Sequence, residues 1–248
     1  MIQNSPIITE AKQKIVDDLL KELPSDSDIQ IELPSECRVY KLPDPEAPIT
    51  LRPMTFEDEK NMLGQSSDTD PVNLILSRCA SNINISDLLP MDKFYLIMKL
   101  REISYGDDYD TLLICSKCRA ENPVSIKISE LNVNPVPDDF CDPIEVELPT
   151  IGKKANVRLP RVRDEKLLTN PKEMIDQLWR FVRDIDGHTD NAVIAAVINK
   201  LPLREVKRII NAMKTDFGVD TKVKLNCNNC KEVSVVDLPF DANFFDVN

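Results

Sequence analysis

The chain has 248 residues, a hydrophobic fraction of 42% and a mean hydropathy of -0.26, values that exclude a fibrous or a largely disordered protein. Its formal net charge of -11 argues against tight binding to nucleic acid, which depends on Lys and Arg contacts to phosphates. The longest apolar run, Ala192–Ile198, is far too short to cross a bilayer, and residues 1–10 lack the basic and apolar regions of a secretory signal.

Residues 1–28 are predicted to form a helical arm at the start of the chain. Apolar residues recur at helical spacing over Ile2–Leu23, and Pro24 then breaks the pattern. The arm lies outside the repeat described below. We therefore expect it either to cap the core or to offer Leu19 and Leu20 to a partner.

Residues 29–131 are predicted to form a first mixed unit. Its strands are expected at three short apolar segments: Ile29–Leu33, Val39–Leu42 and Ile49–Arg52. Three helices are expected, each beginning at a capping residue or near a proline: Thr55 to about Gly64, Val72–Ala80 and Pro90–Tyr105. A hairpin around a Cys-x-x-Cys motif closes the unit, with strands Thr111–Ile114 and Val124–Ile128.

Residues 132–143 are predicted to link this unit to a second one in residues 144–248. The second unit is expected to repeat the plan, with helices at Pro171–Asp184, Asn191–Leu201 and Pro202–Phe217 and a closing hairpin of Lys222–Leu225 and Val233–Leu238. The sequence therefore predicts an α+β fold: a tandem duplication of a small mixed unit with small antiparallel sheets.

The predicted duplication rests on matches between the two halves at a constant spacing of 112 residues. The matching positions are Leu89-Pro90, Gly106, Cys115 and Cys118 in the first half, and Leu201-Pro202, Gly218, Cys227 and Cys230 in the second. The intervening helix repeats its apolar positions, which are expected to pack alike: Phe94, Ile97 and Met98, and Val206, Ile209 and Ile210. Shorter matches precede these in the same order: Ile31–Ser35 with Val146–Thr150, Leu51–Pro53 with Arg158–Pro160, and Asp58–Lys60 with Asp164–Lys166.

Each Cys-x-x-Cys motif falls between two extended segments, which is the setting of a zinc knuckle, whereas a redox motif normally opens a helix. One knuckle supplies two thiolates, and a closed tetrahedral zinc site needs four. We therefore expect one structural zinc ion per chain, bound by both knuckles: Cys115, Cys118, Cys227 and Cys230. The alternatives are reduced thiols without a metal, disulfides, and catalytic cysteines. Basic residues beside the knuckles would offset the charge of four thiolates: Lys117, Arg119 and Lys231.

Other residues that could carry chemistry have simpler interpretations, and no spacing indicates a catalytic constellation or a phosphate loop. The remaining cysteines have no counterpart in the other half and are expected to be small apolar packing groups: Cys37, Cys79 and Cys141. His188, the one histidine of the chain, is expected in a structural turn. Two basic sets are expected on a solvated helix face or turn: Arg158, Arg161 and Arg163, and Lys200, Arg204, Lys207 and Arg208.

Three phenylalanines lie near the end of the chain: Phe240, Phe244 and Phe245. Aromatic side chains at a polar chain end are costly to leave in water. We therefore expect them to dock either on this chain or on a partner.

Three segments in a fixed order resemble the T-even-like family of bacteriophage baseplate hub assembly proteins: Leu33–Ser35, Leu51–Glu59, and Leu100–Tyr109 followed by Cys115 and Cys118. The resemblance covers most of the chain. It implies a non-enzymatic structural or assembly component of a contractile phage tail baseplate, in the hub region, that binds other tail proteins. It also implies synthesis in the cytoplasm of the bacterial host and a place in the tail of the virion.

Two other functions are compatible with the motifs. A zinc-ribbon adaptor in transcription or nucleic-acid metabolism would use the same paired knuckles and would bind DNA in a salt-sensitive way. A thiol oxidoreductase would carry a reactive thiolate in one of the Cys-x-x-Cys motifs.

Overall fold

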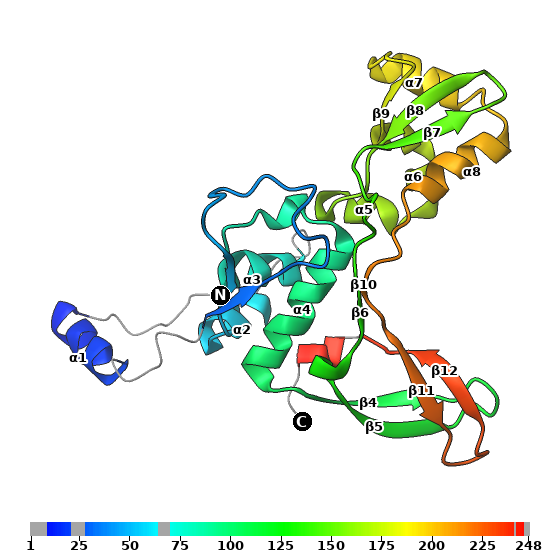
Figure 1. The fold of residues 1–248 in the computed structure, drawn as a ribbon. Helices are drawn as coiled ribbons and strands as arrows, with labels where there is room; N and C mark the ends of the chain where they lie inside the picture. The colour runs from blue at the N-terminus through cyan, green and yellow to red at the C-terminus, as the bar shows by residue number, and fades with distance from the viewer. Residues whose placement is uncertain (1–8, 21–27, 64–69, 241, 246–248) are drawn as a thin grey trace.

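The computed structural model describes residues 9–20, 28–63, 70–240 and 242–245, which form a mixed α+β fold (Figure 1). Apart from the N-terminal helix, we divide them into three parts: a first lobe within residues 28–106, a second lobe of residues 144–217, and a hairpin module from residues 107–131 and 220–245. In Figure 1 the second lobe and the hairpin module lie at opposite ends of the molecule, with the first lobe beside them.

The first lobe packs helices on a small antiparallel sheet. Its strands, in sheet order, are β1 (Ile29–Ile31), β2 (Ile49–Leu51) and β3 (Ala80–Ser81). Its helices are α2 (Phe56–Leu63), α3 (Pro71–Cys79) and α4 (Pro90–Tyr105), with the 3-10 turn η1 (Ile85–Asp87) before α4. Asp70 caps α3 by accepting from the N–H of Val72, and α4 ends at Gly106, whose φ of 98° is costly for other residues. The core of this lobe centres on Leu51, Leu76 and Leu96.

The second lobe has the same sheet order. Its strands are β7 (Ile144–Leu148), β8 (Lys153–Val157) and β9 (Val182–Ile185). Its helices are α5 (Glu165–Leu168), α6 (Pro171–Asp176), α7 (Asn191–Ile198) and α8 (Leu203–Ala212), with 3-10 turns η3 (Val162–Asp164) and η4 (Leu178–Phe181). Phe181, Ile194 and Ile209 are fully buried at its centre.

The hairpin module contains one hairpin from each half of the sequence. Its elements are β4 (Asp108–Ile114), β5 (Glu121–Lys127), η2 (Ile128–Glu130), β11 (Lys222–Asn226), β12 (Val233–Asp237) and η5 (Ala242–Phe245). Two further strands, β6 (Val133–Asn134) and β10 (Gly218–Val219), pair with each other between this module and the second lobe (Figure 1).

The two lobes repeat the same side-chain contacts beside their sheets. Arg52 and Arg158 each donate a backbone N–H to the residue before the third strand, at 3.0 and 2.7 Å. Each guanidinium also binds a carboxylate six residues further on with both oxygens, Asp58 in the first lobe and Asp164 in the second. This contact accounts for the Arg and Asp that recur in the two halves of the sequence.

A second contact recurs at the end of the first strand. Asp92 of α4 accepts a hydrogen bond from the N–H of Ser35 at 3.0 Å, and Glu205 of α8 accepts one from the N–H of Thr150 at 2.6 Å. Both carboxylates are buried near the start of their helices. The Leu-Pro-Ser and Leu-Pro-Thr segments therefore turn in the same way.

Three element predictions were wrong in identity or ran well past the observed end, whereas the helix expected over Asn191–Leu201 and the strands of the first hairpin differ from the structure by a few residues at their ends. The strand expected at Val39–Leu42 is replaced by turns, because the N–H groups of Arg38 and Tyr40 bond to carbonyls three residues back. The helix expected over Pro171–Asp184 ends at Asp176, and the chain continues through η4 into β9, which pairs with β8. The helix expected over Pro202–Phe217 ends at Ala212.

The expected equivalence of apolar positions in α4 and α8 was also wrong. On α4, Phe94 and Met98 pack against the hairpin module, and Ile97 lies between the first lobe and the module. On α8, the residues expected to be equivalent pack inside the second lobe: Val206, Ile209 and Ile210. The reason is that α4 has two covered faces and α8 has one. Toward its own sheet α4 buries Leu96 and Leu100 instead.

The predicted linker, residues 132–143, is packed between the lobes. Val136 and Phe140 join Leu159 and Phe217 in a small apolar cluster, with the Phe140 and Phe217 rings 4.9 Å apart. The N–H of Val162 also donates to Leu88 O at 2.9 Å. These contacts hold the second lobe against the first.

The helix α1 (Glu10–Leu20) buries none of its residues, and Figure 1 shows it apart from both lobes. The rest of the helix predicted over Ile2–Leu23 lies outside the described residues. Leu19 and Leu20 are exposed, so α1 does not cap the core. No helix in the described parts of the chain is long and apolar enough to span a membrane.

Candidate metal centre

The two Cys-x-x-Cys motifs sit at the tips of hairpins with matching backbone geometry. The N–H of Cys115 donates to Ala120 O at 3.0 Å, and the N–H of Cys227 donates to Glu232 O at 2.9 Å. The turns close through a left-handed residue, Arg119 with φ 61° and Lys231 with φ 58°. Neither motif opens a helix, so the helix N-terminus that activates a redox thiol is missing from these described turns.

The four sulfurs of these motifs come together in one cluster. Cys115 Sγ lies 3.7 Å from Cys230 Sγ, and Cys118 Sγ lies 3.6 Å from Cys227 Sγ. All four lie within 4.8 Å of one another. Four sulfurs held about 2.3 Å from a central zinc at tetrahedral angles would be about 3.8 Å apart, whereas a disulfide needs about 2.0 Å. The cluster is therefore consistent with a four-thiolate metal site.

Backbone hydrogen bonds bias two thiols toward the thiolate that binds metal. The N–H of Cys230 lowers the pKa of Cys227 to about 6, and the N–H of Ala120 lowers the pKa of Cys118. At Cys230 the hydrogen bond from the Glu232 N–H is outweighed by removal from water and by three neighbouring sulfurs, which raise the pKa to about 12. Four thiolates this close repel one another, so a divalent cation is the group that would let all four ionise together.

Polar side chains tie the two knuckles together around the sulfurs. The buried Asn122 of β5 accepts from the N–H of Asn228 at 2.8 Å, and Asn229 donates to Cys118 Sγ at 3.6 Å. Lys117 Nζ pairs with Glu232 Oε2 of the other hairpin at 2.6 Å. The sequence analysis did not single out Asn122 as a residue of the centre. The one feature that could have indicated it is a polar residue at an inward-facing position of β5.

An aromatic cluster packs in the hairpin module at the start of β4 and after the end of β12, away from the knuckles. The Phe94 and Phe240 rings are 4.7 Å apart, and Tyr109 and Phe244 are 5.0 Å apart. Arg101 Nε donates to Phe244 O at 3.1 Å. Phe240, Phe244 and Phe245 thus pack on this chain, which is the intramolecular alternative of the two expected.

We expect Phe244→Ala to lower the free energy of unfolding by about 3 to 5 kcal/mol, because the ring is fully enclosed by the module. Val235→Ala is the matched control, since Val235 is an exposed apolar residue of the same module. Urea denaturation of both variants measures the difference. Equal stability of the two variants would show that the C-terminal aromatic residues are not part of the core.

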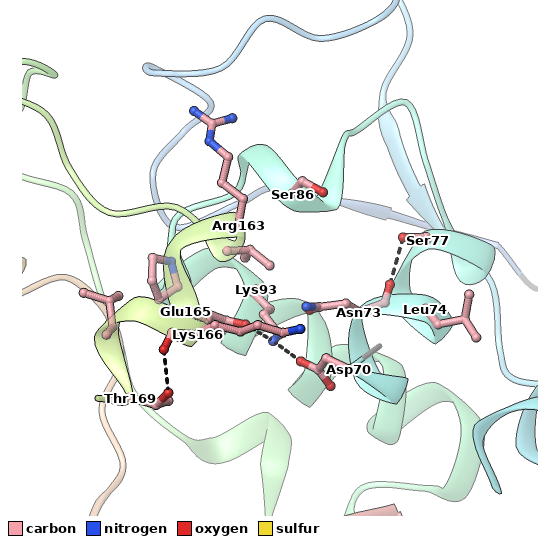
Figure 2. Close-up of a pocket in the computed structure, with 13 residues that line it drawn as sticks. Asp70, Asn73, Leu74, Ser77, Ser86, Lys93, Arg163, Glu165, Lys166 and Thr169 are labelled. Carbon is pink, nitrogen blue, oxygen red and sulfur yellow. Dashed lines mark hydrogen bonds and ion pairs between the residues drawn. The ribbon is translucent and has the colours of Figure 1, made fainter. Parts of the chain in front are cut away.

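A separate cleft of about 830 Å³ lies between the two lobes (Figure 2). Lys93 of α4 is buried there between Asp70 and Glu165, at 3.0 and 2.7 Å. Figure 2 shows the three charged groups meeting inside the cleft. The pair between Lys93 of the first lobe and Glu165 of the second joins the lobes. None of the described residues that line the cleft is a cysteine.

The remaining candidates behave mostly as packing or turn residues. His188 is exposed beside the turn that Gly187 and Asp184 form, as predicted. Cys79 is buried and Cys37 is partly buried against the first core. Cys141 is exposed, so the prediction of an apolar packing role was wrong for it. The first basic set is paired with carboxylates: Arg158 with Asp164, Arg161 with Asp142, and Arg163 with Asp87.

The fold and the cluster define a class of protein: a mixed α+β chain whose two halves meet at one four-cysteine centre. The chain belongs to the T4 bacteriophage base plate protein family, because the family model matches residues 35–246. No curated protein and no solved structure matches the chain. Membership implies a structural role in the phage baseplate, generally without enzymatic activity, and a location in the phage tail.

Proposed function

We propose that this protein is a structural or assembly component of the hub region of a contractile phage tail baseplate, where it binds other tail proteins. The family match over residues 35–246 carries this proposal. It favours a baseplate role over a zinc-ribbon adaptor of nucleic-acid metabolism. The net charge of -11 supports the same choice, since a nucleic-acid adaptor gains its affinity from cationic contacts.

We further propose that the centre binds one structural zinc ion per chain through Cys115, Cys118, Cys227 and Cys230. Support comes from sulfur separations of 3.6 and 3.7 Å, which suit tetrahedral thiolate ligation. Four protein ligands leave no open position for a substrate, so the ion would act as a cross-link. The cross-link would join segments more than a hundred residues apart in the sequence.

We infer that the halves are two copies of one unit, residues 29–131 and 144–248, joined by the linker 132–143 and preceded by the arm 1–28. The recurring Arg52–Asp58 and Arg158–Asp164 pairs support this inference. In this arrangement each copy contributes one hairpin to the shared centre. The centre could then form only after both copies have folded.

We propose that α1 is a contact segment for another subunit. Leu19 and Leu20 are exposed on it, and an isolated helix of this length is marginal in water. A bound partner would supply the apolar contacts that α1 lacks.

Mass spectrometry of finished phage particles and of purified baseplate intermediates tests the proposed function. We expect the chain in at least one of these, together with hub proteins, and a capsid protein found only in finished particles serves as the control for purity of the intermediates. Absence from both, together with tight binding of the purified chain to DNA at moderate salt, would contradict the baseplate role.

A further inference from the structure

The two hairpins of the module turn their inner sides toward each other. Leu113 of β4 and Leu225 of β11 lie in one core cluster together with the four clustered cysteines. Because side chains alternate across a strand, the other residues of each hairpin point away from this core. The module therefore presents two outer faces on opposite sides, at the end of the molecule away from the second lobe (Figure 1).

The outer face of the first hairpin is apolar near the knuckle and acidic around it. Leu112 and Ile114 are each 52% exposed, and the exposed Pro123 lies opposite Leu112 on β5. Both Leu112 and Pro123 line a hollow of about 370 Å³. The charged residues of this face are three carboxylates and one lysine, all exposed: Asp108, Asp110, Glu121 and Lys127. The lysine lies opposite the first carboxylate, so the face has an excess of negative charge.

The outer face of the second hairpin combines an apolar ridge with positive charge. Val233 and Val235 of β12 are 65% and 61% exposed. The exposed Lys224 of β11 lies beside them, opposite Val235. A second exposed lysine, Lys222, lies opposite Asp237. Two lysines and one carboxylate give this face an excess of positive charge.

Residues 112 positions apart in the two hairpins agree on the inner faces and differ on the outer ones. The inner Leu113 corresponds to Leu225, and both are buried. On the outer faces an apolar residue of one hairpin corresponds to a charged residue of the other: Leu112 to Lys224, and Val233 to Glu121. The shared core explains the inner residues. It does not explain why the outer faces carry apolar groups in water and charges of opposite sign.

We propose that the outer face of the first hairpin binds the outer face of the second hairpin of another copy of this chain. The ridge of Val233 and Val235 would enter the hollow beside Leu112, and Lys224 would approach the acidic border of that hollow. Apolar groups then meet apolar groups, and a negative face meets a positive one. Two copies of the acidic face would instead repel each other.

A contact of this kind joins different faces of the two copies, so every chain keeps one free face and the contact can repeat until a ring closes. It goes beyond the proposed binding to other tail proteins. Each face is two strands wide and five to seven residues long, which is small for a stable interface. We therefore expect association at high protein concentration, weakened by salt.

Molar mass of the purified full chain, measured by light scattering over a range of concentrations and salt, tests this contact. A first-hairpin variant, Leu112→Lys with Ile114→Lys, should be monomeric, and so should a second-hairpin variant, Val233→Glu with Val235→Glu. Each variant places on its face the charge that the opposing face already carries. Both should keep the wild-type melting temperature, because the replaced side chains are exposed. Mixing the two variants should restore association, since each retains one intact face.

Leu19→Lys with Leu20→Lys on α1 is the matched control, because these leucines are exposed apolar residues outside the module. It should associate as the wild type does. Loss of association in this variant alone would assign the contact to α1 and overturn the proposal.

A wild type that stays monomeric up to about 1 mM, the Kd of a very weak complex, would also overturn it. So would loss of association in one hairpin variant but not in the other, because one face would then bind its own copy. A mixture of the two hairpin variants that stays monomeric would contradict the pairing of unlike faces. The purified chain is the sole component, so failure here is distinct from absence of the protein from phage particles.

Discussion

Cys115→Ser should destabilise both hairpins together and should abolish stoichiometric metal binding. Two-stranded hairpins are marginal on their own, and the sulfur cluster is the point where these two meet. Structural zinc sites contribute on the order of 10 kcal/mol of binding free energy, so even partial loss should lower the melting temperature by many degrees. Thermal unfolding, followed alongside metal content, measures both effects.

Cys141→Ser is the matched control, because Cys141 is an exposed cysteine outside the cluster. It should leave both the melting temperature and the metal content unchanged. A strong chelator should lower the melting temperature of the wild type toward that of Cys115→Ser. If Cys115→Ser and Cys141→Ser melted alike, the cluster would have no structural role.

Asp58→Asn should be the most damaging polar substitution in the first lobe. The Asp58 side chain is fully buried and accepts from Arg52 at 2.7 Å, from Arg78 at 2.7 Å and from the N–H of Thr55 at 2.9 Å. An amide has one oxygen for these donors and no charge for the two guanidinium groups. We expect a loss of about 3 kcal/mol in the free energy of unfolding, measured in urea.

Asp164→Asn in the second lobe is the matched comparison. Asp164 holds a similar place, but its side chain is slightly exposed, and it pairs with the single guanidinium of Arg158 where Asp58 pairs with two. Its loss should therefore be smaller. A larger effect of Asp164→Asn would contradict the account of Asp58 as a shared acceptor.

The same pair predicts how stability depends on pH. The Arg52 guanidinium beside Asp58 holds the pKa of that carboxyl well below its usual range. A carboxyl whose pKa falls on folding adds stability above its unfolded pKa, about 3.9, and loses that contribution as the pH falls toward the folded pKa. The wild type should therefore lose stability in acid more steeply than Asp58→Asn, and parallel curves would argue against the ion pair.

The cysteine centre could be predicted from the sequence because its signals are local and repeated. Pro90 and Gly106 bound α4 as predicted, and each motif follows at equal spacing a glycine with positive φ, although Gly218 lies in β10 and not at the end of α8. Two similar hairpins that each supply half of a ligand set can then meet at one point. The sulfur positions agree with that inference.

Tertiary contacts determine several features that local sequence patterns could not predict. The segment Val182–Ile185 continues an apolar spacing that suits a helix, yet it becomes β9 because β8 offers an open strand edge. Similarly, α4 has apolar residues on more than one face, and only the folded chain tells which of them meets the hairpin module. Phe244 contacts Arg101 and Tyr109, which are far away in the sequence. No local pattern could therefore predict whether Phe244 packs on its own chain or on a partner.

X-ray absorption at the zinc edge, on protein purified without added metal, tests the central claim most directly. We predict one zinc per chain with four sulfur neighbours at about 2.3 Å. Folded protein without metal whose four clustered thiols react freely with an alkylating agent, or zinc bound by two sulfurs and two lighter atoms, would contradict it.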